Sequence, residues 1–147
     1  MRVGIATDHG GFGLKEELVT RLKTAGQEVV DLGAYTVADY PDCALPLAGA
    51  VVVGRVDRGI AICGSGVSSS VCANKVNGVR AALIHDHFSA KLGVEDGPHI
   101  LCMGGRTVGP LVAWDLVETF LNAKFSQGPR HLWRLGKVAS AEAEKSH

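Results

Sequence analysis

The chain has 147 residues and a mass of 15.4 kDa, which is room for one domain spanning residues 1–147. Apolar residues make up 46% of it and charged residues 20%, a balance that excludes a disordered chain, and its apolar runs stop well short of the ~18 residues of a membrane span. Lys and Arg together number 15, as do Asp and Glu, so the net charge of zero argues against a nucleic-acid-binding surface.

Short β-branched runs alternate with helical patterns along the whole chain. Leu14, Leu18 and Leu22 are spaced by four and predict one apolar helix face, which Gly26 ends, and Pro41 suits the first turn of a second helix. In chain order, the strands are predicted at 3–7, 28–32, 59–63, 79–85 and 99–103, and the helices at 12–25, 40–53, 67–75, 107–123 and 130–144, with a short helix or loop at 86–94.

This alternation predicts an α/β fold with three αβα layers. We expect a doubly wound, Rossmann-like sheet of five parallel strands in the order 2-1-3-4-5, with its switch point between strands 1 and 3. Ligands bind outside the carboxyl ends of the strands at such a point. Strand 1 ends in Asp8-His9-Gly10-Gly11 and strand 3 in Cys63-Gly64-Ser65-Gly66, so these two loops are predicted to form one crevice.

The run Cys63-Gly64-Ser65-Gly66-Val67-Ser68-Ser69-Ser70 lies between a predicted strand and a predicted helix. Glycines and serines there let backbone N–H groups approach an anion, and the helix dipole adds to their attraction. Those N–H groups would favour a thiolate at Cys63, which could act as a base at neutral pH. The alternative is a buried cysteine before an ordinary tight turn, and Cys72 and Cys102 are interpreted as such core residues.

The N-terminal apolar stretch is too short for a secretory signal, and the four cysteines form no C-x-x-C pair. We therefore expect a cytoplasmic protein with free thiols.

Two groups of residues could bind a phosphorylated ligand. Asp8 and His9 would more often be turn formers or a helix cap, but beside the Cys63 loop they could orient a sugar oxygen and contact a phosphate. Four basic residues form the second group. Two of them are arginines four residues apart, so they share one face of a helix. Their guanidinium groups could bind phosphate oxygens, or the face could simply be exposed to solvent. These four are Arg106, after the fifth strand, and Arg130, His131 and Arg134, at the start of the last helix.

Two other functions are less well supported. Gly64-x-Gly66, with Asp86 about twenty residues on, resembles a dinucleotide-binding fingerprint, but Ser69 stands where the third glycine belongs and the motif follows the third strand. His85-Asp86-His87 would be a weak metal motif without further ligands.

Taken together, the motifs resemble those of the type B ribose-5-phosphate isomerases and the galactose-6-phosphate isomerase subunits, from the first strand almost to the C-terminus. The Cys-Gly-Ser-Gly loop followed by Ala-Asn-Lys is the specific part of the resemblance. The matching segments are Asp8-His9-Gly10-Gly11, Asp39-Tyr40-Pro41, Ile62-Cys63-Gly64-Ser65-Gly66-Val67, Ala73-Asn74-Lys75-Val76-Asn77-Gly78-Val79-Arg80-Ala81, Gly104-Gly105-Arg106 and Gly128-Pro129-Arg130-His131.

The resemblance implies aldose–ketose isomerisation of a sugar phosphate of the ribose 5-phosphate type, through a cis-enediol(ate), with no metal and no organic cofactor. Cys63 would move the proton between C2 and C1. Ser65 and the backbone amides of 64–69 would hold the oxyanion, and Asp8 would contact a ring or hydroxyl oxygen. His9, Arg106, Arg130 and Arg134 would bind the phosphate. The other residues expected to bind substrate are Tyr40, Gly64, Gly66, Val67, Ser68, Ser69, Asp96, His99 and His131.

The family's last helix reaches a neighbouring subunit. The resemblance therefore implies a homodimer or homotetramer in which the C-terminal helix packs on the partner, and in which Arg130 and Arg134 serve the partner's site.

The chain departs from the family pattern just before the fifth strand. Family members commonly carry a His-Asn pair there, whose His assists opening of the sugar ring. Here residues 93–99 read Gly-Val-Glu-Asp-Gly-Pro-His, one residue short, so Glu95 or Asp96 replaces that His, and His99 already begins the strand. Ser68 also stands where a glycine is usual.

A carboxylate before the fifth strand would oppose the charge of the phosphate and of the enediolate. The departure therefore favours a sugar that needs no ring opening, such as a tetrose 4-phosphate. A hexose 6-phosphate substrate and a non-catalytic sugar-phosphate-binding homologue are the remaining alternatives.

Overall fold

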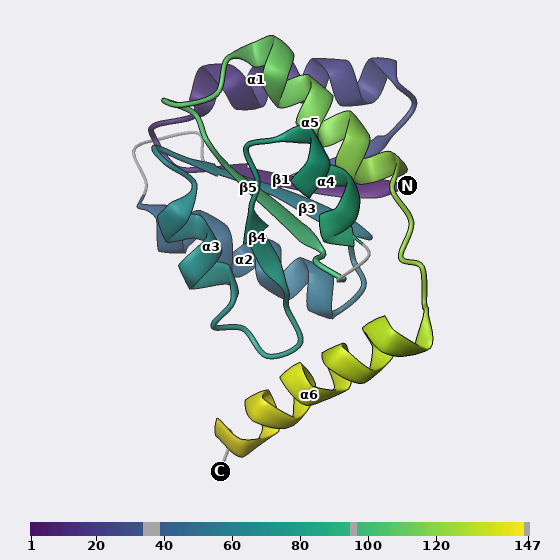
Figure 1. The fold of residues 1–147 in the computed structure, drawn as a ribbon. Coiled ribbons are helices and arrows are strands. Elements are labelled where there is room, and N and C mark those ends of the chain that lie inside the picture. The colour runs from purple at the N-terminus through teal and green to yellow at the C-terminus, as the bar shows by residue number, and fades with distance from the viewer. Residues whose placement is uncertain (34–38, 95–96, 146–147) are drawn as a thin grey trace.

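The computed structural model describes residues 1–33, 39–94 and 97–145 (Figure 1). Its strands are β1 Arg2–Thr7, β2 Glu28–Asp31, β3 Arg58–Cys63, β4 Ala81–Leu83 and β5 Ile100–Gly104. Its helices are α1 Phe12–Thr24, α2 Tyr40–Val52, α3 Val67–Ala73, α4 His87–Gly93, α5 Pro110–Asn122 and α6 Pro129–Lys145. The predicted α/β fold is confirmed, and the segment 86–94 contains a helix.

The five strands are all parallel, in the order β2-β1-β3-β5-β4. The predicted order 2-1-3-4-5 is thus wrong in its last two strands. Every residue of β5 is buried, as a strand with neighbours on both sides requires. β4 has only three residues, and Leu83 at its end is 41% exposed, which suits an edge strand.

The corrected order moves one helix to the other face of the sheet. Crossovers between parallel strands are right-handed, so α4, which leads from the edge strand β4 back to β5, must cover the face opposite to α2 and α3. The buried side chains of α1, α4 and α5 accordingly form one core cluster, and those of α2 and α3 form another. Figure 1 shows α1 and α5 above the sheet and α2 and α3 below it. The switch point between β1 and β3 is unaffected.

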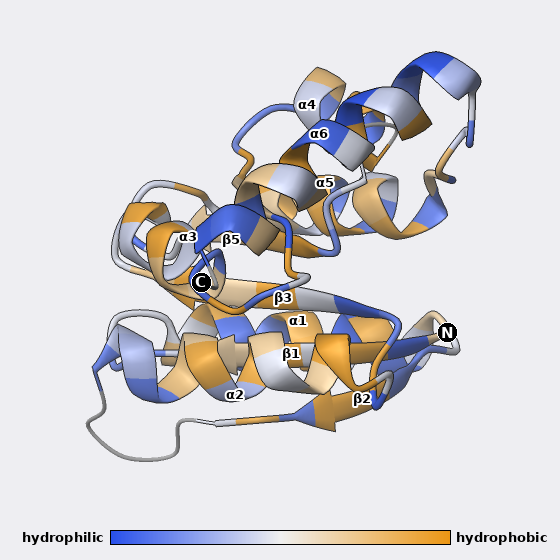
Figure 2. Ribbon diagram, turned by 90° about the horizontal axis from the view of Figure 1, so that it is seen from below, coloured by the Kyte–Doolittle hydropathy of each residue, from blue (hydrophilic) through white to orange (hydrophobic). Residues whose placement is uncertain are grey.

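Both cores follow from the apolar periodicity of the sequence. As predicted, Leu14, Leu18 and Leu22 form the buried face of α1. In Figure 2, hydrophobic stretches recur along β1, β2 and α2, whereas α6 alternates between hydrophilic or pale and hydrophobic stretches. None of the helices in the described part of the chain has the length and apolarity to cross a membrane.

The last helix, α6, lies apart from the three layers (Figure 1) and has no buried residue. It runs beside the segments that enter β4 and β5, because Glu142 Oε1 accepts the N–H of Gly78 at 2.9 Å and Leu135 packs close to Gly97. Trp133 is 65% exposed on this helix. A helix of this length with an uncovered apolar side is typical of an interface.

Arg58 ties the start of β3 to the end of α5, and its loss is expected to destabilise the fold. Its Nη1 donates to the carbonyl of Phe120, its Nη2 donates to that of Ala123 at 2.7 Å, and its guanidinium lies 5.4 Å from the centre of the Phe120 ring. Arg58→Met should lower the free energy of unfolding by about 2 kcal/mol, because charged hydrogen bonds to helix-end carbonyls are lost.

Urea unfolding at fixed protein concentration measures this loss. Arg55→Met, at an exposed position, is the matched control and should change stability by less than about 0.5 kcal/mol. Equal stability of the two variants would contradict the role assigned to Arg58.

Candidate active site

The loops that follow β1, β3 and β5 meet at the carboxyl edge of the sheet. Asp8 N–H donates to the carbonyl of Ile62 at 3.1 Å, which joins the first loop to β3. Gly105 N–H donates to the carbonyl of Cys63 at 2.7 Å, and Arg106 N–H to that of Gly64 at 3.1 Å. The two loops predicted to form one crevice therefore lie side by side, and the loop after β5 joins them.

Glycines permit this close approach. A Cβ on Gly10 would lie 3.6 Å from the backbone nitrogen of Gly64, and one on Gly105 would lie 3.0 Å from the carbonyl oxygen of Gly10. At Gly104 a Cβ would come within 2.8 Å of the Gly64 carbonyl oxygen. Where these loops meet, backbone therefore packs on backbone, which the missing glycine side chains permit.

Cys63 ends β3 and is 3% exposed. Its Sγ accepts the N–H of Gly66 at 3.0 Å, so a backbone dipole points at the sulfur. Gly66 has φ +82°, and a Cβ there would come within 2.8 Å of the carbonyl carbon of Met103, so only glycine turns the chain back at this point. An N–H held on the sulfur stabilises negative charge there.

The other three cysteines have different surroundings. Burial, with a smaller contribution from Cys63, raises the pKa of the Cys102 thiol to about 12. Burial raises the pKa of Cys72 and, together with the charges of Asp8 and Asp42, that of Cys43. All four cysteines are free, as predicted. Cys102 is buried in the core, as expected, but the expectation for Cys72 is wrong, because its place on α3 leaves it only half-buried.

Two polar residues of the site are buried. Asp8 is 8% exposed, and its Oδ1 accepts the N–H of Gly10 at 2.8 Å, which fixes the carboxylate at the start of the loop. Ser69, in the first turn of α3, is 2% exposed, and its Oγ has no hydrogen-bond partner within the part of the chain that the structure describes. Buried hydroxyls without a partner are uncommon in folded proteins.

Several other predicted residues share this edge. Tyr40 begins α2 there and is 41% exposed. Val67, 50% exposed, begins α3, and its N–H donates to Ser65 Oγ at 3.3 Å, while Ser68 is half-buried. His9 and Arg106 are exposed, and the side chain of Arg106 lies over Gly64.

The remaining predicted residues lie elsewhere in the same chain. His99 precedes β5 and is therefore at the amino edge, across the sheet from Cys63. Its Nε2 lies 3.0 Å from Arg80 Nη2, and burial, with the charges of Arg80 and Arg58, lowers the pKa of His99 to about 4. Asp96 lies outside the described residues.

The basic residues of α6 also lie on that side. α5 runs back from the carboxyl edge, so α6 begins at the amino edge with Arg130, His131 and Arg134. One chain does not bring these three, or His99, to its own Cys63 loop.

The triplet His85-Asp86-His87 does not converge on one point. His85 Nε2 accepts the N–H of Gly104 at 3.1 Å, and His87 Nδ1 lies 3.1 Å from Asp115 Oδ2. Across residues 1–33, 39–94 and 97–145, no three His, Cys, Asp or Glu side chains are grouped to hold a metal ion.

Lys15 was not predicted from the sequence. Its side chain is 1% exposed, and its Nζ donates to both oxygens of Asp31 at 3.0 Å. Its spacing was a usable signal, because Lys15 precedes Leu18 by three and Leu22 by seven and so falls on the buried face of α1.

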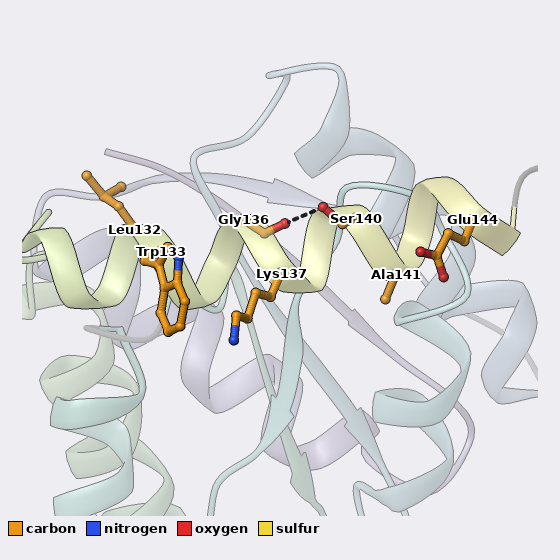
Figure 3. A pocket seen from close by; sticks show the side chains of 7 residues that line it. All are labelled: Leu132, Trp133, Gly136, Lys137, Ser140, Ala141 and Glu144. Carbon is orange, nitrogen blue, oxygen red and sulfur yellow. Dashed lines mark hydrogen bonds between the residues drawn. The ribbon is translucent and has the colours of Figure 1, made fainter.

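A groove of about 630 Å³ runs along α6 (Figure 3). Lys137 Nζ lies 3.8 Å from the centre of the Trp133 ring, and Ser140 Oγ donates to the Gly136 carbonyl at 3.0 Å, as the dashed line shows. The full lining is Leu132, Trp133, Gly136, Lys137, Ser140, Ala141 and Glu144.

The chain was compared with known proteins. A family model described as Ribose/Galactose Isomerase matches residues 3–138. A solved structure titled as a study of Clostridium thermocellum ribose-5-phosphate isomerase B superposes with a TM-score of 0.95 at 44% identity, covering 99% of both chains. The putative sugar phosphate isomerase YwlF of Bacillus subtilis is 44% identical over 97% of both chains. The D-erythrulose-4-phosphate isomerase of Pectobacterium atrosepticum is 31% identical, over 100% of this chain and 99% of its own.

Proposed function

Because the chain belongs to the ribose/galactose isomerase family, we propose that its aldose–ketose isomerase activity on a phosphorylated sugar uses Cys63 as the base. The observation that carries this proposal is the position of the Cys63 sulfur. It lies at the carboxyl end of β3, next to the loop that follows β1, and accepts the N–H of Gly66 at 3.0 Å. Of the four cysteines, Cys63 is the one that directly precedes the Gly-Ser-Gly run between a strand and a helix.

In the proposed reaction, the Cys63 thiolate removes the proton from C2 of the aldose. The electrons of the C2–H bond form the C1–C2 double bond, and the carbonyl oxygen on C1 takes up the negative charge of the enediolate. Cys63 then returns the proton to C1. The proton of the 2-hydroxyl moves to the negatively charged oxygen on C1, so C2 becomes the carbonyl carbon and the ketose is formed. No electron leaves the substrate, so the step needs no redox cofactor.

The developing charge would be held by Ser65 and the backbone amides of 64–69. N–H groups in the first turn of a helix have no partner within that helix. α3 begins at Val67, whose N–H donates to Ser65 Oγ, so the next two amides, those of Ser68 and Ser69, are the ones that would serve the enediolate. The proposed oxyanion-binding loop, residues 64–69, also includes Gly64, Gly66 and Ser69. Preorganised donors of this kind act where charge appears in the transition state, which is where they accelerate the reaction most.

Residues around this oxyanion-binding loop would hold the rest of the substrate. Asp8 would contact a ring or hydroxyl oxygen, and its fixed carboxylate supports such a role. His9 and Arg106 would bind the phosphate from the same chain, and Tyr40 would border the sugar at the start of α2.

A second copy of the chain would complete the phosphate site. Arg130 and Arg134 lie at the amino edge of their own sheet, and the apolar side of α6, with Trp133 65% exposed, is uncovered. A homodimer in which α6 packs on the partner would cover that side and present both guanidiniums to the partner's Cys63 loop. His99 and His131, at the same edge, would face the partner too, and two such dimers could pair into a tetramer.

The proposed substrate is of the ribose 5-phosphate type. A tetrose 4-phosphate is the second candidate, because the segment Gly93–His99 lacks the expected His-Asn pair and a tetrose needs no ring opening. The relative from Pectobacterium atrosepticum, named for a tetrulose 4-phosphate, supports this second candidate.

A panel of aldose and ketose phosphates tests both candidates. We expect kcat/KM to differ by at least about tenfold among tetrose 4-, pentose 5- and hexose 6-phosphates, because the polar groups of a site reject sugars that leave them unpaired. The highest value for ribose 5-phosphate would support the first candidate, and the highest for a tetrose the second. Thermal stabilisation by these sugars without any turnover would contradict the proposed function.

A further inference from the structure

Lys15 is a buried lysine in the apolar face of α1. Its side chain is 1% exposed, and its Nζ donates to both Asp31 oxygens at 3.0 Å, with Glu16 Oε1 3.6 Å away. A buried ion pair is weak support for stability, because the cost of removing two charges from water offsets their attraction. Apolar side chains could fill this space, so the presence of an ammonium calls for another explanation.

Asp31 transmits the position of Lys15 to the end of β1. The same Oδ1 that accepts from Lys15 also accepts the N–H of Gly33 at 3.0 Å. The carbonyl of Gly33 in turn accepts the N–H of Thr7 at 2.9 Å. The β1–β2 ladder ends at the pair Ile5 and Asp31, so the contact between Gly33 and Thr7 extends the connection beyond the sheet.

Thr7 directly precedes Asp8, the carboxylate proposed to contact the sugar. The position of Thr7, together with the hydrogen bond from Asp8 N–H to the Ile62 carbonyl, therefore sets where the Asp8 side chain begins. The charges of Asp8 and Lys15 both act on the Cys43 thiol: that of Asp8 raises its pKa, after the larger effect of burial, and that of Lys15 lowers it.

We propose that Lys15 is a positioning residue of the isomerase site, which holds Asp8 in place through Asp31, Gly33 and Thr7. This inference rests on the proposed function, in which Asp8 contacts a substrate oxygen. Lys15 itself is below the surface and acts on the site through these neighbours. Small displacements of an oriented group lower a rate strongly, so a change at Lys15 reaches the chemistry.

The first test is Lys15→Met, which keeps the length of the side chain and removes its charge. We expect kcat to fall by about tenfold or more, with KM less affected. The reason is that a displaced Asp8 would orient the sugar less well in the transition state, while most of the contacts that bind the substrate would remain. Lys23→Met, an exposed lysine on the same helix, is the matched control and should retain wild-type kinetics. If Lys15→Met does not fold, the apolar pair Lys15→Met/Asp31→Leu should fold and show the same loss in kcat.

A double-mutant cycle with Asp8→Asn separates positioning from a general structural effect. If Lys15 acts through Asp8, adding Lys15→Met to Asp8→Asn should change kcat by less than about twofold, because coupled residues are not additive. A further fall as large as that seen in the wild-type background would overturn the inference, as would wild-type kcat in Lys15→Met. Wild-type activity of Asp8→Asn would instead contradict the proposed role of Asp8, and the inference would fall with it.

Discussion

Cys63→Ala is expected to lower kcat by about a hundredfold to ten-thousandfold, because general acid–base catalysis of a proton transfer contributes a factor in this range. The fold should survive, since Cys63 lies at the end of a strand and alanine removes only the sulfur. A coupled isomerase assay measures the activity, and circular dichroism with urea unfolding measures the fold. Retention of most of the turnover would show that another group is the base.

Cys72→Ala is the matched control for this change. Cys72 is half-buried on α3, and burial raises the pKa of its thiol, so it is an ordinary neutral side chain. Its replacement should leave both kcat and stability nearly unchanged. Isomerisation by the wild-type protein in deuterated water provides an independent check, because proton transfer through a thiol exchanges with solvent. Product without any deuterium would indicate hydride migration and contradict the proposed role of Cys63.

Mixing two inactive variants is expected to restore activity if the site is shared between copies. Cys63→Ala lacks the base, and Arg130→Ala/Arg134→Ala lacks the phosphate ligands that α6 would present to the partner. Random pairing makes half of the dimers mixed, and each mixed dimer has one intact site, so about a quarter of wild-type activity should return. The coupled assay on refolded mixtures measures it.

The control places both defects in one chain. Cys63→Ala mixed with Cys63→Ala/Arg130→Ala/Arg134→Ala contains no intact base, so no activity should return. If the first mixture also stayed inactive although size-exclusion chromatography showed mixed dimers, the arginines would not serve the partner's site. If Arg130→Ala/Arg134→Ala kept full activity without any mixing, the proposed role of these arginines in binding the phosphate would be wrong.

Patterns among neighbouring residues were sufficient to predict most of the helices and strands. The leucine spacing in α1 and the β-branched runs of β1 and β3 each report burial by immediate neighbours, and their ends match the predicted ones to within about two residues, as is usual for such boundaries. The meeting of the loops after β1 and β3 was predicted as well, because a parallel sheet brings the ends of these strands to one edge.

The same patterns could not predict the order of the last two strands in the sheet. Residues 79–85 and 99–103 are both apolar enough for a central strand, and the sequence does not state which one has two neighbours. That choice depends on how α3, α4 and α5 cover the sheet, which is a property of the whole chain. The face on which α4 packs follows from the same choice.

By itself, the sequence determined the α/β architecture and the meeting of the loops after β1 and β3 at one edge of the sheet, because hydrophobic periodicity and glycine-rich turns act over a few neighbouring positions. Only the tertiary structure decided that His99 and the arginines of α6 lie across the sheet from Cys63, and that Lys15 is buried against Asp31. Those relations depend on where distant segments come to rest, and burial and charge pairing between them are set by packing rather than by spacing along the chain.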